Sequence, residues 1–215
     1  MDEPLVCCIL PYHIPDYYQQ AIECFDSQTY ANKQLVAVDT STMPRVHGLI
    51  RNNLIASTPK NCLIAHWDSD DWSCSTRLTE QVTHICGTQA SIVGYRDMPF
   101  YDVRTHQVTL YKQTNQRYAL GTSLMYWRSV WEQHPFIELA GDEDAKFEQD
   151  VGFDKVATQS SVDLIAAPRM VARIHPGNTS AKGGARYEKA TPELAAAVLA
   201  CLKPLNVAQS VSATR

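Results

Sequence analysis

Residues 64–72 read Ile64-Ala65-His66-Trp67-Asp68-Ser69-Asp70-Asp71-Trp72, which places three carboxylates within four positions directly after an apolar run. Residues i and i+2 of an extended segment lie on the same face, so Asp68 and Asp70 can converge on one hard cation. Carboxylates this close repel each other unless a positive charge lies between them, and a divalent metal ion supplies such a charge. The alternative is a solvated turn in which Ser73 or Ser75 caps the next helix, because Asp and Ser favour such positions.

Three short apolar runs, Leu5–Leu10, Leu35–Val38 and Cys62–Ala65, lead up to this stretch. None alternates with polar residues, which is typical of strands buried on both faces of a parallel sheet. The segments between them, Pro15–Ser27 and roughly Val46–Ala56, are candidate helices. The order strand, helix, strand, helix, strand predicts the beginning of a doubly wound α/β sheet.

The rest of the chain contains shorter candidate elements. Apolar spacing predicts helices at Ser75–Thr88, Arg128–His134, Glu143–Phe153 and Pro192–Leu202. We expect strands at Ser91–Tyr95, Thr109–Tyr111, Leu124–Trp127 and Val171–Ile174. Residues 182–185 resemble a hinge, and we expect residues 207–215 to be frayed because they have little apolar content.

Length and composition indicate one ordinary globular domain. The chain has 215 residues and a formal net charge of −4, which gives no overall electrostatic footprint for strong nucleic-acid binding. Its seven cysteines have no C-x-x-C spacing, which argues against a zinc ribbon or a disulfide framework. The start Met-Asp-Glu-Pro lacks the basic residues of a signal peptide, and no apolar stretch approaches 18 residues. We therefore expect a cytoplasmic protein.

Polar and aromatic side chains follow the first three predicted strands. The first strand ends at Pro11-Tyr12, the second at Asp39 and the third at Asp68-Ser69-Asp70. An isolated Asp after a strand is usually a turn residue. However, ligands of open α/β sheets bind at the carboxyl ends of the strands, so three such ends together favour a binding site.

In this order of motifs, the chain resembles the family 2 glycosyltransferases with the GT-A fold, in particular short bacterial or phage-like members. The strand ending in Pro11-Tyr12, the strand ending in Asp39 and the Asp68-x-Asp70-Asp71 run match the donor half of that family. Thr40 stands where many members have a second Asp. Three later segments also resemble the family: an acceptor-side segment at 121–136, a Glu-Asp motif at Gly141-Asp142-Glu143-Asp144 and a late histidine at Ile174-His175-Pro176.

The resemblance covers residues 5–182 and implies a Rossmann-like mixed sheet flanked by helices. Residues 1–182 would form a single domain, with a nucleotide-sugar-binding half at 1–95 and an acceptor-side half at 96–182. Residues 183–215 would add a C-terminal helix and the frayed tail.

The resemblance also implies a divalent metal, Mn²⁺ or Mg²⁺. Both ions take oxygen ligands and keep several positions for water or substrate, so one or two protein carboxylates suffice. Asp70 would be the direct ligand, while Asp68 would contact the ribose or bind the metal through water, and Asp71 would be structural. His175 would supply a further ligand; its alternative is a hydrogen-bonded structural histidine.

The expected nucleotide-sugar site lies at the first two strand ends. Asp39 would accept a hydrogen bond from the base, which favours a UDP-sugar, and Pro11 and Tyr12 would pack near the base or ribose. Tyr12 could equally belong to the core. Arg51 would either face the diphosphate or be a solvated helix charge, and we favour the solvated charge.

The expected acceptor side contains the catalytic base. Asp144 would take the proton of the attacking hydroxyl, and Glu143 would help to hold the acceptor. Alternatively, these acids only enrich the first turn of a helix and favour its dipole. Gly121 and Trp127 would contribute to the acceptor side, although the spacing of Trp127 and Trp131 is also what core packing produces.

We therefore expect a metal-dependent, inverting glycosyltransferase that moves a hexose or pentose from a nucleoside diphosphate sugar to a hydroxyl acceptor. The acceptor class stays open among glycan, protein, lipid and modified nucleic acid. One alternative is a non-catalytic nucleotide- or sugar-binding module. Another is a metal-dependent nucleotidyltransferase, but it would need a Gly-rich or basic phosphate-binding loop near the acids, and the sequence has none.

Overall fold

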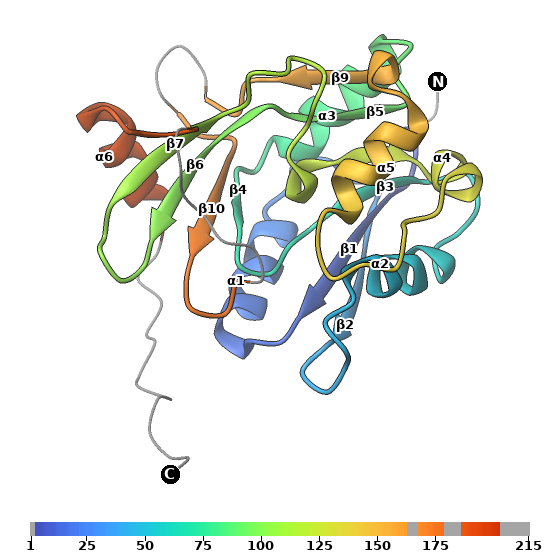
Figure 1. Ribbon diagram of the computed structural model, residues 1–215, viewed down its shortest axis with the longest axis horizontal. Helices are drawn as coiled ribbons and strands as arrows, with labels where there is room; N and C mark the ends of the chain where they lie inside the picture. Colours follow the sequence, from blue (N-terminus) through green and yellow to red (C-terminus); the bar gives the residue numbers. More distant parts are fainter. Residues whose placement is uncertain (1–2, 163–166, 179–185, 203–215) are drawn as a thin grey trace.

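The computed structural model describes residues 3–162, 167–178 and 186–202, which form two sheets and their covering helices (Figure 1). The larger sheet has six strands in the order β2-β1-β3-β8-β5-β9. Its strands are β1 (Val6–Tyr12), β2 (Lys33–Asp39), β3 (Leu63–His66), β5 (Ile92–Tyr95), β8 (Met125–Trp127) and β9 (Val156–Gln159). β1 is parallel to β2 and β3, whereas β8 is antiparallel to both of its neighbours, β3 and β5. The sheet is therefore mixed.

The three apolar runs form the first three strands as predicted, but β2 is only half-buried. This expectation was wrong for β2 because it is the edge strand, with only one neighbour. β1 lies inside the sheet, and residues 6–10 are fully buried.

Helices cover both faces of the larger sheet. Cys7 and Ile9 point to the face covered by α2 (His47–Ala56) and α5 (Glu143–Val151), on which the short α4 (Arg128–Gln133) also packs. Val6, Cys8 and Leu10 point to the face covered by α1 (Pro15–Asp26) and α3 (Arg77–Gly87). Because successive side chains of a strand point to opposite faces, one apolar run serves two cores.

The smaller sheet has five strands in the order β11-β7-β6-β10-β4. They are β4 (Trp72–Ser73), β6 (Asp97–Asp102), β7 (Val108–Lys112), β10 (Met170–Ile174) and β11 (Tyr187–Lys189). Helix α6 (Pro192–Cys201) covers one face of this sheet through Leu194 and Val198. The short β4 follows Asp71 directly and pairs with β10, so the acidic run lies where the two sheets meet.

Both sheets combine distant parts of the sequence. Strands β8 and β9 come late in the chain but belong to the larger sheet, and β4 comes early but belongs to the smaller one. The expected hinge at 182–185 and the expected frayed tail at 207–215 both lie outside the described residues. Among the described residues, no helix is both long and apolar enough to cross a membrane.

Candidate active site

A cavity of about 520 Å³ lies at the carboxyl ends of β1, β2 and β3 and extends to the smaller sheet. It brings together most of the predicted site residues: Pro11, Arg51, Asp68, Asp70, Gly121, Glu143 and Asp144. Tyr12, Asp39, Trp127 and His175 are not among the described residues that line it. His175 nevertheless contacts Asp70, and its loop neighbours Gly177 and Asn178 line the cavity.

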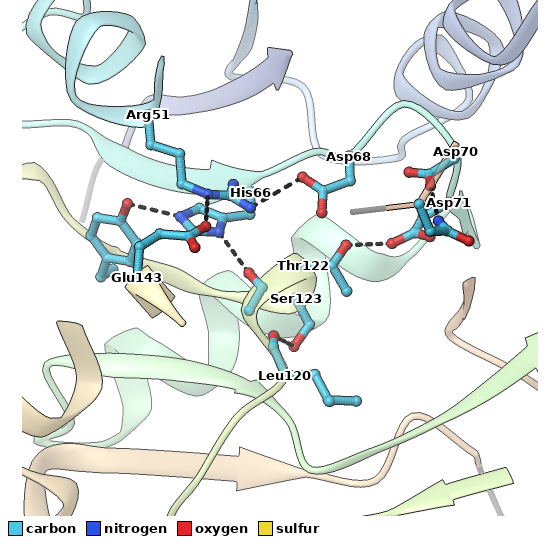
Figure 2. Close-up of polar contacts among 12 residues, drawn as sticks. Arg51, His66, Asp68, Asp70, Asp71, Leu120, Thr122, Ser123 and Glu143 are labelled. Atoms are coloured by element: carbon cyan, nitrogen blue, oxygen red, sulfur yellow. Dashed lines mark hydrogen bonds and ion pairs between the residues drawn. The ribbon is translucent and has the colours of Figure 1, made fainter. Parts of the chain in front are cut away.

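Arg51 lies in the interior of the site, between two carboxylates (Figure 2). Its guanidinium forms ion pairs with Asp68 at 3.5 Å and with Glu143 at 3.3 Å. Burial disfavours the cation, but the charges of Asp68, Glu143 and Asp144 outweigh burial and raise the pKa of Arg51. With 6% of its surface exposed, Arg51 is not the solvated helix charge that we favoured. Arg51 lies on the buried face of α2.

Asp70 meets the late histidine segment. Its Oδ2 accepts hydrogen bonds from Nε2 of His175 and from Nδ2 of Asn178, both at 3.0 Å. The Gly177 amide donates to Nδ1 of His175 at 3.1 Å, so the imidazole proton lies on Nε2. Burial alone would raise the pKa of Asp70, but the hydrogen bond from His175 opposes burial, and the pKa is lowered. Residues 105 positions apart thus form one polar cluster.

Asp70 and His175 have the donor types and the spacing of a divalent-metal site. Adjacent ligands of an octahedral ion with bonds of about 2.1 Å lie about 3.0 Å apart, which matches the Asp70 Oδ2 to His175 Nε2 distance of 3.0 Å. Within the described part of the chain, no three His, Cys, Asp or Glu side chains are grouped closely enough to hold an ion. A metal held here would therefore need water or substrate oxygens as its other ligands.

Asp71 and His66 attach the short turn η1 (Gly121–Ser123) to the acidic run. Asp71 is buried and accepts a hydrogen bond from the Thr122 hydroxyl (Figure 2). The fully buried His66 contacts the Gly121 carbonyl oxygen through Nδ1 at 2.6 Å and the Tyr126 hydroxyl through Nε2 at 3.0 Å. Burial and the Arg51 charge lower the pKa of His66 well below its usual value, so the ring is neutral.

Gly121 is required by the close approach of Asp144. A Cβ added at Gly121 would lie 1.6 Å from Oδ2 of Asp144. Burial and the neighbouring Glu143 raise the pKa of Asp144 above its usual value, while Arg51 opposes them. Asp144 is thus a carboxyl group with increased proton affinity at the cavity wall, and Glu143 is the partner of Arg51.

Glu148, one turn after Asp144 on α5, was not predicted as a site residue. It is fully buried, and its Oε2 accepts a hydrogen bond from the Ala119 amide at 2.9 Å, whereas Oε1 has no partner in the described part of the chain. Burial raises the pKa of Glu148 to about 8. Glu148 follows Asp144 by four positions, which places both acids on one face of the helix. This spacing is the sequence signal that could have predicted Glu148 as a neighbour of the site.

Tyr12 and Asp39 lie at the edge of the sheet expected to bind the nucleoside, and both side chains have partners within the chain. Tyr12 and Asp39 are neighbours in the β1–β2 register, but the Tyr12 ring stacks on Tyr18 with 3.9 Å between centroids. Asp39 is exposed and accepts a hydrogen bond from the Ser41 amide at 2.8 Å, which lowers the pKa of Asp39. The cavity wall itself consists there of Pro11, Thr40 and Ser41.

Three basic side chains of this wall, His13, Arg45 and His47, were not predicted. Burial and the Arg45 charge lower the pKa of His13. Nε2 of His47 is buried and has no hydrogen-bond partner among the described residues. His13 follows β1, and Arg45 and His47 lie just before and at the start of α2. Their places after strand ends are the signal that the sequence offered.

The tryptophan predicted for the acceptor side lies elsewhere. Trp127 pairs with Leu63 across β8 and β3 and packs against the hydrophobic core. Trp131 also packs against a core and donates a hydrogen bond from Nε1 to Asn52 Oδ1 at 2.8 Å. The structure does not bring Trp127 to the cavity, because a central strand directs its side chains into the helix layers.

The fold matches solved glycosyltransferases. The sequence matches no protein-family model and no curated protein. Among solved structures, S. aureus TarS 1–349 in complex with UDP has a TM-score of 0.60 and 14% identity, over 80% of this chain and 61% of that one. The mannosyltransferase PcManGT from Pyrobaculum calidifontis, in complex with GDP-Man and Mn²⁺, has a TM-score of 0.52 and 11% identity, over 80% of this chain and 57% of that one.

The chain therefore has the expected glycosyltransferase fold, a Rossmann-like mixed α/β sheet flanked by helices. It spans about three fifths of the length of these two solved chains.

Proposed function

We propose that the chain is a metal-dependent, inverting glycosyltransferase that moves a hexose or pentose from a nucleoside diphosphate sugar to a hydroxyl acceptor. The observation that carries the proposal is that one cavity is lined both by the Asp68 and Asp70 pair and by Asp144. A donor-binding group and a proton acceptor can thus reach the same bound sugar. Residues 1–95 supply the donor half and 96–182 the acceptor half, with 183–215 as a C-terminal helix and tail.

In this proposal Asp70 and His175 hold Mn²⁺ or Mg²⁺, and Asp68 contacts the ribose or binds the ion through water. The bound ion supplies Lewis-acid stabilisation of the negative charge on the departing diphosphate. Arg51 orients Asp68 through their ion pair. Its NH1 group is buried without a hydrogen-bond partner in the described part of the chain, so it remains available to a diphosphate oxygen.

We propose that the nucleoside binds at the ends of β1 and β2, against Pro11 and beside Tyr12. Asp39 accepts a hydrogen bond from the base N–H with the oxygen positions that the Ser41 amide leaves open. This role favours uracil, and TarS was solved with UDP. PcManGT was solved with GDP-Man, so the fold accommodates more than one base.

The transfer is a single displacement at the anomeric carbon. The acceptor oxygen forms a bond to this carbon while the bond to the diphosphate oxygen breaks, and Asp144 takes the hydroxyl proton. Its raised pKa makes Asp144 a better proton acceptor than an exposed carboxylate. A direct displacement inverts the configuration of the sugar, and no covalent sugar–enzyme intermediate forms.

A screen of nucleotide sugars with and without Mn²⁺ tests the proposal. UDP-, GDP-, ADP- and CDP-sugars are mixed with the full chain, and both binding by calorimetry and slow donor hydrolysis are measured. We expect a UDP-sugar to bind and to be hydrolysed only when the metal is present. If no nucleotide sugar binds in the presence of Mn²⁺ or Mg²⁺, the proposal is wrong, whereas binding without hydrolysis or transfer points to a binding module.

A further inference from the structure

Three aromatic side chains of the smaller sheet line the far part of the cavity: Phe100 on β6, Tyr111 on β7 and Tyr187 on β11. We call these three side chains the aromatic wall. Their rings contact one another at steep angles, with centroids 5.1 Å apart for Tyr111 and Tyr187 and 5.3 Å for Phe100 and Tyr187. Tyr111 and Tyr187 are direct cross-strand neighbours.

Phe100 and Tyr111 are mostly buried in a hydrophobic core, with 4% and 8% of their surface exposed, and Tyr187 packs against this core. Helix α6 packs on the opposite face, against Val108 and Val171. Strand alternation turns Phe100 and Tyr111 to the other side, where they pack with Met98 and face the cavity. Tyr187 is half-buried, so part of its ring is accessible from the cavity.

Tyr118 lines the cavity together with Asp144 and the aromatic wall. Burial, Asp144 and Glu148 raise the pKa of Tyr118, and Tyr111 adds to the effect, so the phenol lies within electrostatic reach of both the proposed base and the aromatic wall. Because Asp144 and the aromatic wall line one cavity, an acceptor whose hydroxyl reaches Asp144 can also contact the aromatic wall.

We propose that the aromatic wall binds a sugar ring of the acceptor, which makes the acceptor a carbohydrate. This inference rests on the proposed function. A pyranose has one apolar C–H face and a rim of hydroxyl groups, and tyrosines combine an apolar ring face with a hydroxyl that accepts or donates.

The charges near the aromatic wall favour a neutral carbohydrate over nucleic acid. A single-stranded nucleic acid requires a basic groove beside its stacking platform. Here Asp142 and Asp144 line the cavity, whereas its basic side chains His13, Arg45 and His47 lie beside the ends of β1 and β2. Of the arginines nearer the aromatic wall, Arg173 donates to the Asp70 carbonyl oxygen at 2.8 Å and Arg186 to the Tyr111 hydroxyl at 3.2 Å.

The test is ligand-observed NMR of the full chain with millimolar neutral disaccharides, namely cellobiose, maltose, lactose and chitobiose, in the presence of UDP and Mn²⁺. Oligouridine and phosphatidylglycerol vesicles are the probes for the competing acceptor classes. We expect at least one disaccharide to bind, and Tyr187→Ala to weaken that binding about fivefold to tenfold. Tyr187→Phe, which keeps the ring, should retain most of it.

Tyr101→Ala is the matched control, because Tyr101 lies on β6 but packs with the cluster under α6. It should leave disaccharide binding unchanged. The inference is overturned if no disaccharide binds, if binding survives Tyr187→Ala, or if only oligouridine or vesicles bind in a Tyr187-dependent way. UDP binding is measured in the same samples and distinguishes failure of this inference from failure of the proposed function. If UDP does not bind to wild type, the proposed function itself is contradicted.

Discussion

At the scale of single residues, Asp70 is the side chain on which the proposed donor site depends. Its carboxylate is held by His175 and Asn178, and its own carbonyl oxygen accepts a hydrogen bond from Arg173 at 2.8 Å. The backbone and side chain of Asp70 are therefore both fixed before any ligand arrives. Such preorganisation lets a metal bind without a large cost in ordering.

Asp70→Asn should abolish metal-dependent UDP binding and lower the transfer rate by about 10²- to 10⁴-fold, because leaving-group stabilisation is worth several kcal/mol. The fold should persist, since the amide oxygen can still accept from Asn178. Calorimetry with UDP and Mn²⁺ and a turnover assay measure both effects. Asp150→Asn, which removes only an exposed carboxylate paired with Lys146, is the control. Full wild-type turnover in excess EDTA would contradict the metal assignment.

Asp144→Asn keeps the shape of the side chain but removes its capacity to accept a proton. Transfer should fall by roughly 10²- to 10⁴-fold while the dissociation constant for UDP with Mn²⁺ stays unchanged. Because the pKa of Asp144 lies above its usual value, wild-type kcat/KM should fall as the pH drops through that raised pKa, and the mutant should lose this acidic limb. Normal transfer by the mutant would exclude Asp144 as the base, and lost UDP binding would place it in the donor site.

At the scale of elements, helix α5 is attached to the loop before η1 by one buried carboxyl group. Glu148 accepts from the Ala119 amide, two residues before the Gly121 that contacts Asp144. Its position determines how the first turn of α5 meets η1. Because the pKa of Glu148 is about 8, the group is protonated in the folded protein at neutral pH and ionised in the unfolded chain.

This difference predicts a pH-dependent stability. The unfolded Glu148 carboxyl loses its proton near 4.5 and the folded one near 8, so the folded state binds more protons between these values and stability falls as pH rises through this window. Urea unfolding at pH 5, 7 and 9 should show wild type losing on the order of 2–4 kcal/mol relative to Glu148→Gln. Glu188→Gln, at an exposed glutamate, should follow wild type. Parallel pH curves for wild type and Glu148→Gln would contradict the raised pKa.

At the scale of the whole molecule, the cavity joins the two sheets. The acidic run links the end of β3 to β4, and His175 follows β10, so the Asp70 cluster joins the larger sheet to the smaller one. A ligand at Asp70 therefore contacts both sheets at once. Its binding should stabilise the molecule as a unit.

UDP with Mn²⁺ at about one hundred times its dissociation constant should increase the free energy of unfolding by roughly 2.7 kcal/mol. Thermal unfolding should remain one cooperative transition at a higher Tm, because both sheets share the site. EDTA, or the Asp70→Asn substitution, should remove the increase. A ligand that shifts only part of a split transition would show that the two sheets unfold independently.

Much of the larger sheet could be predicted from the sequence. The apolar runs at β1 and β3 are readable because a strand buried on both faces must be apolar at every position. Of the smaller sheet, β7 and β10 were predicted, but β4, β6 and β11 were not. β6 starts and ends with Asp and contains Pro99, and β4 and β11 have only two and three residues. β4 and β11 exist because strands far away in the sequence, β10 and β7, pair with them, and no local pattern records that pairing.

The same distinction separates what the sequence alone determined about the site from what only the tertiary structure decided. The location of Asp39 at a strand end follows from local backbone geometry, which the sequence encodes directly. The extended run expected through Asp68 and Asp70 was wrong, because Ser69 and Asp70 lie in a turn in which the Asp71 amide donates a hydrogen bond to the Asp68 carbonyl oxygen at 3.3 Å. The burial of Arg51, the packing of Trp127 into the core and the meeting of Phe100, Tyr111 and Tyr187 depend on contacts between segments far apart in the chain. These contacts form only when two sheets and their helices pack together, and packing free energy is a property of the whole fold.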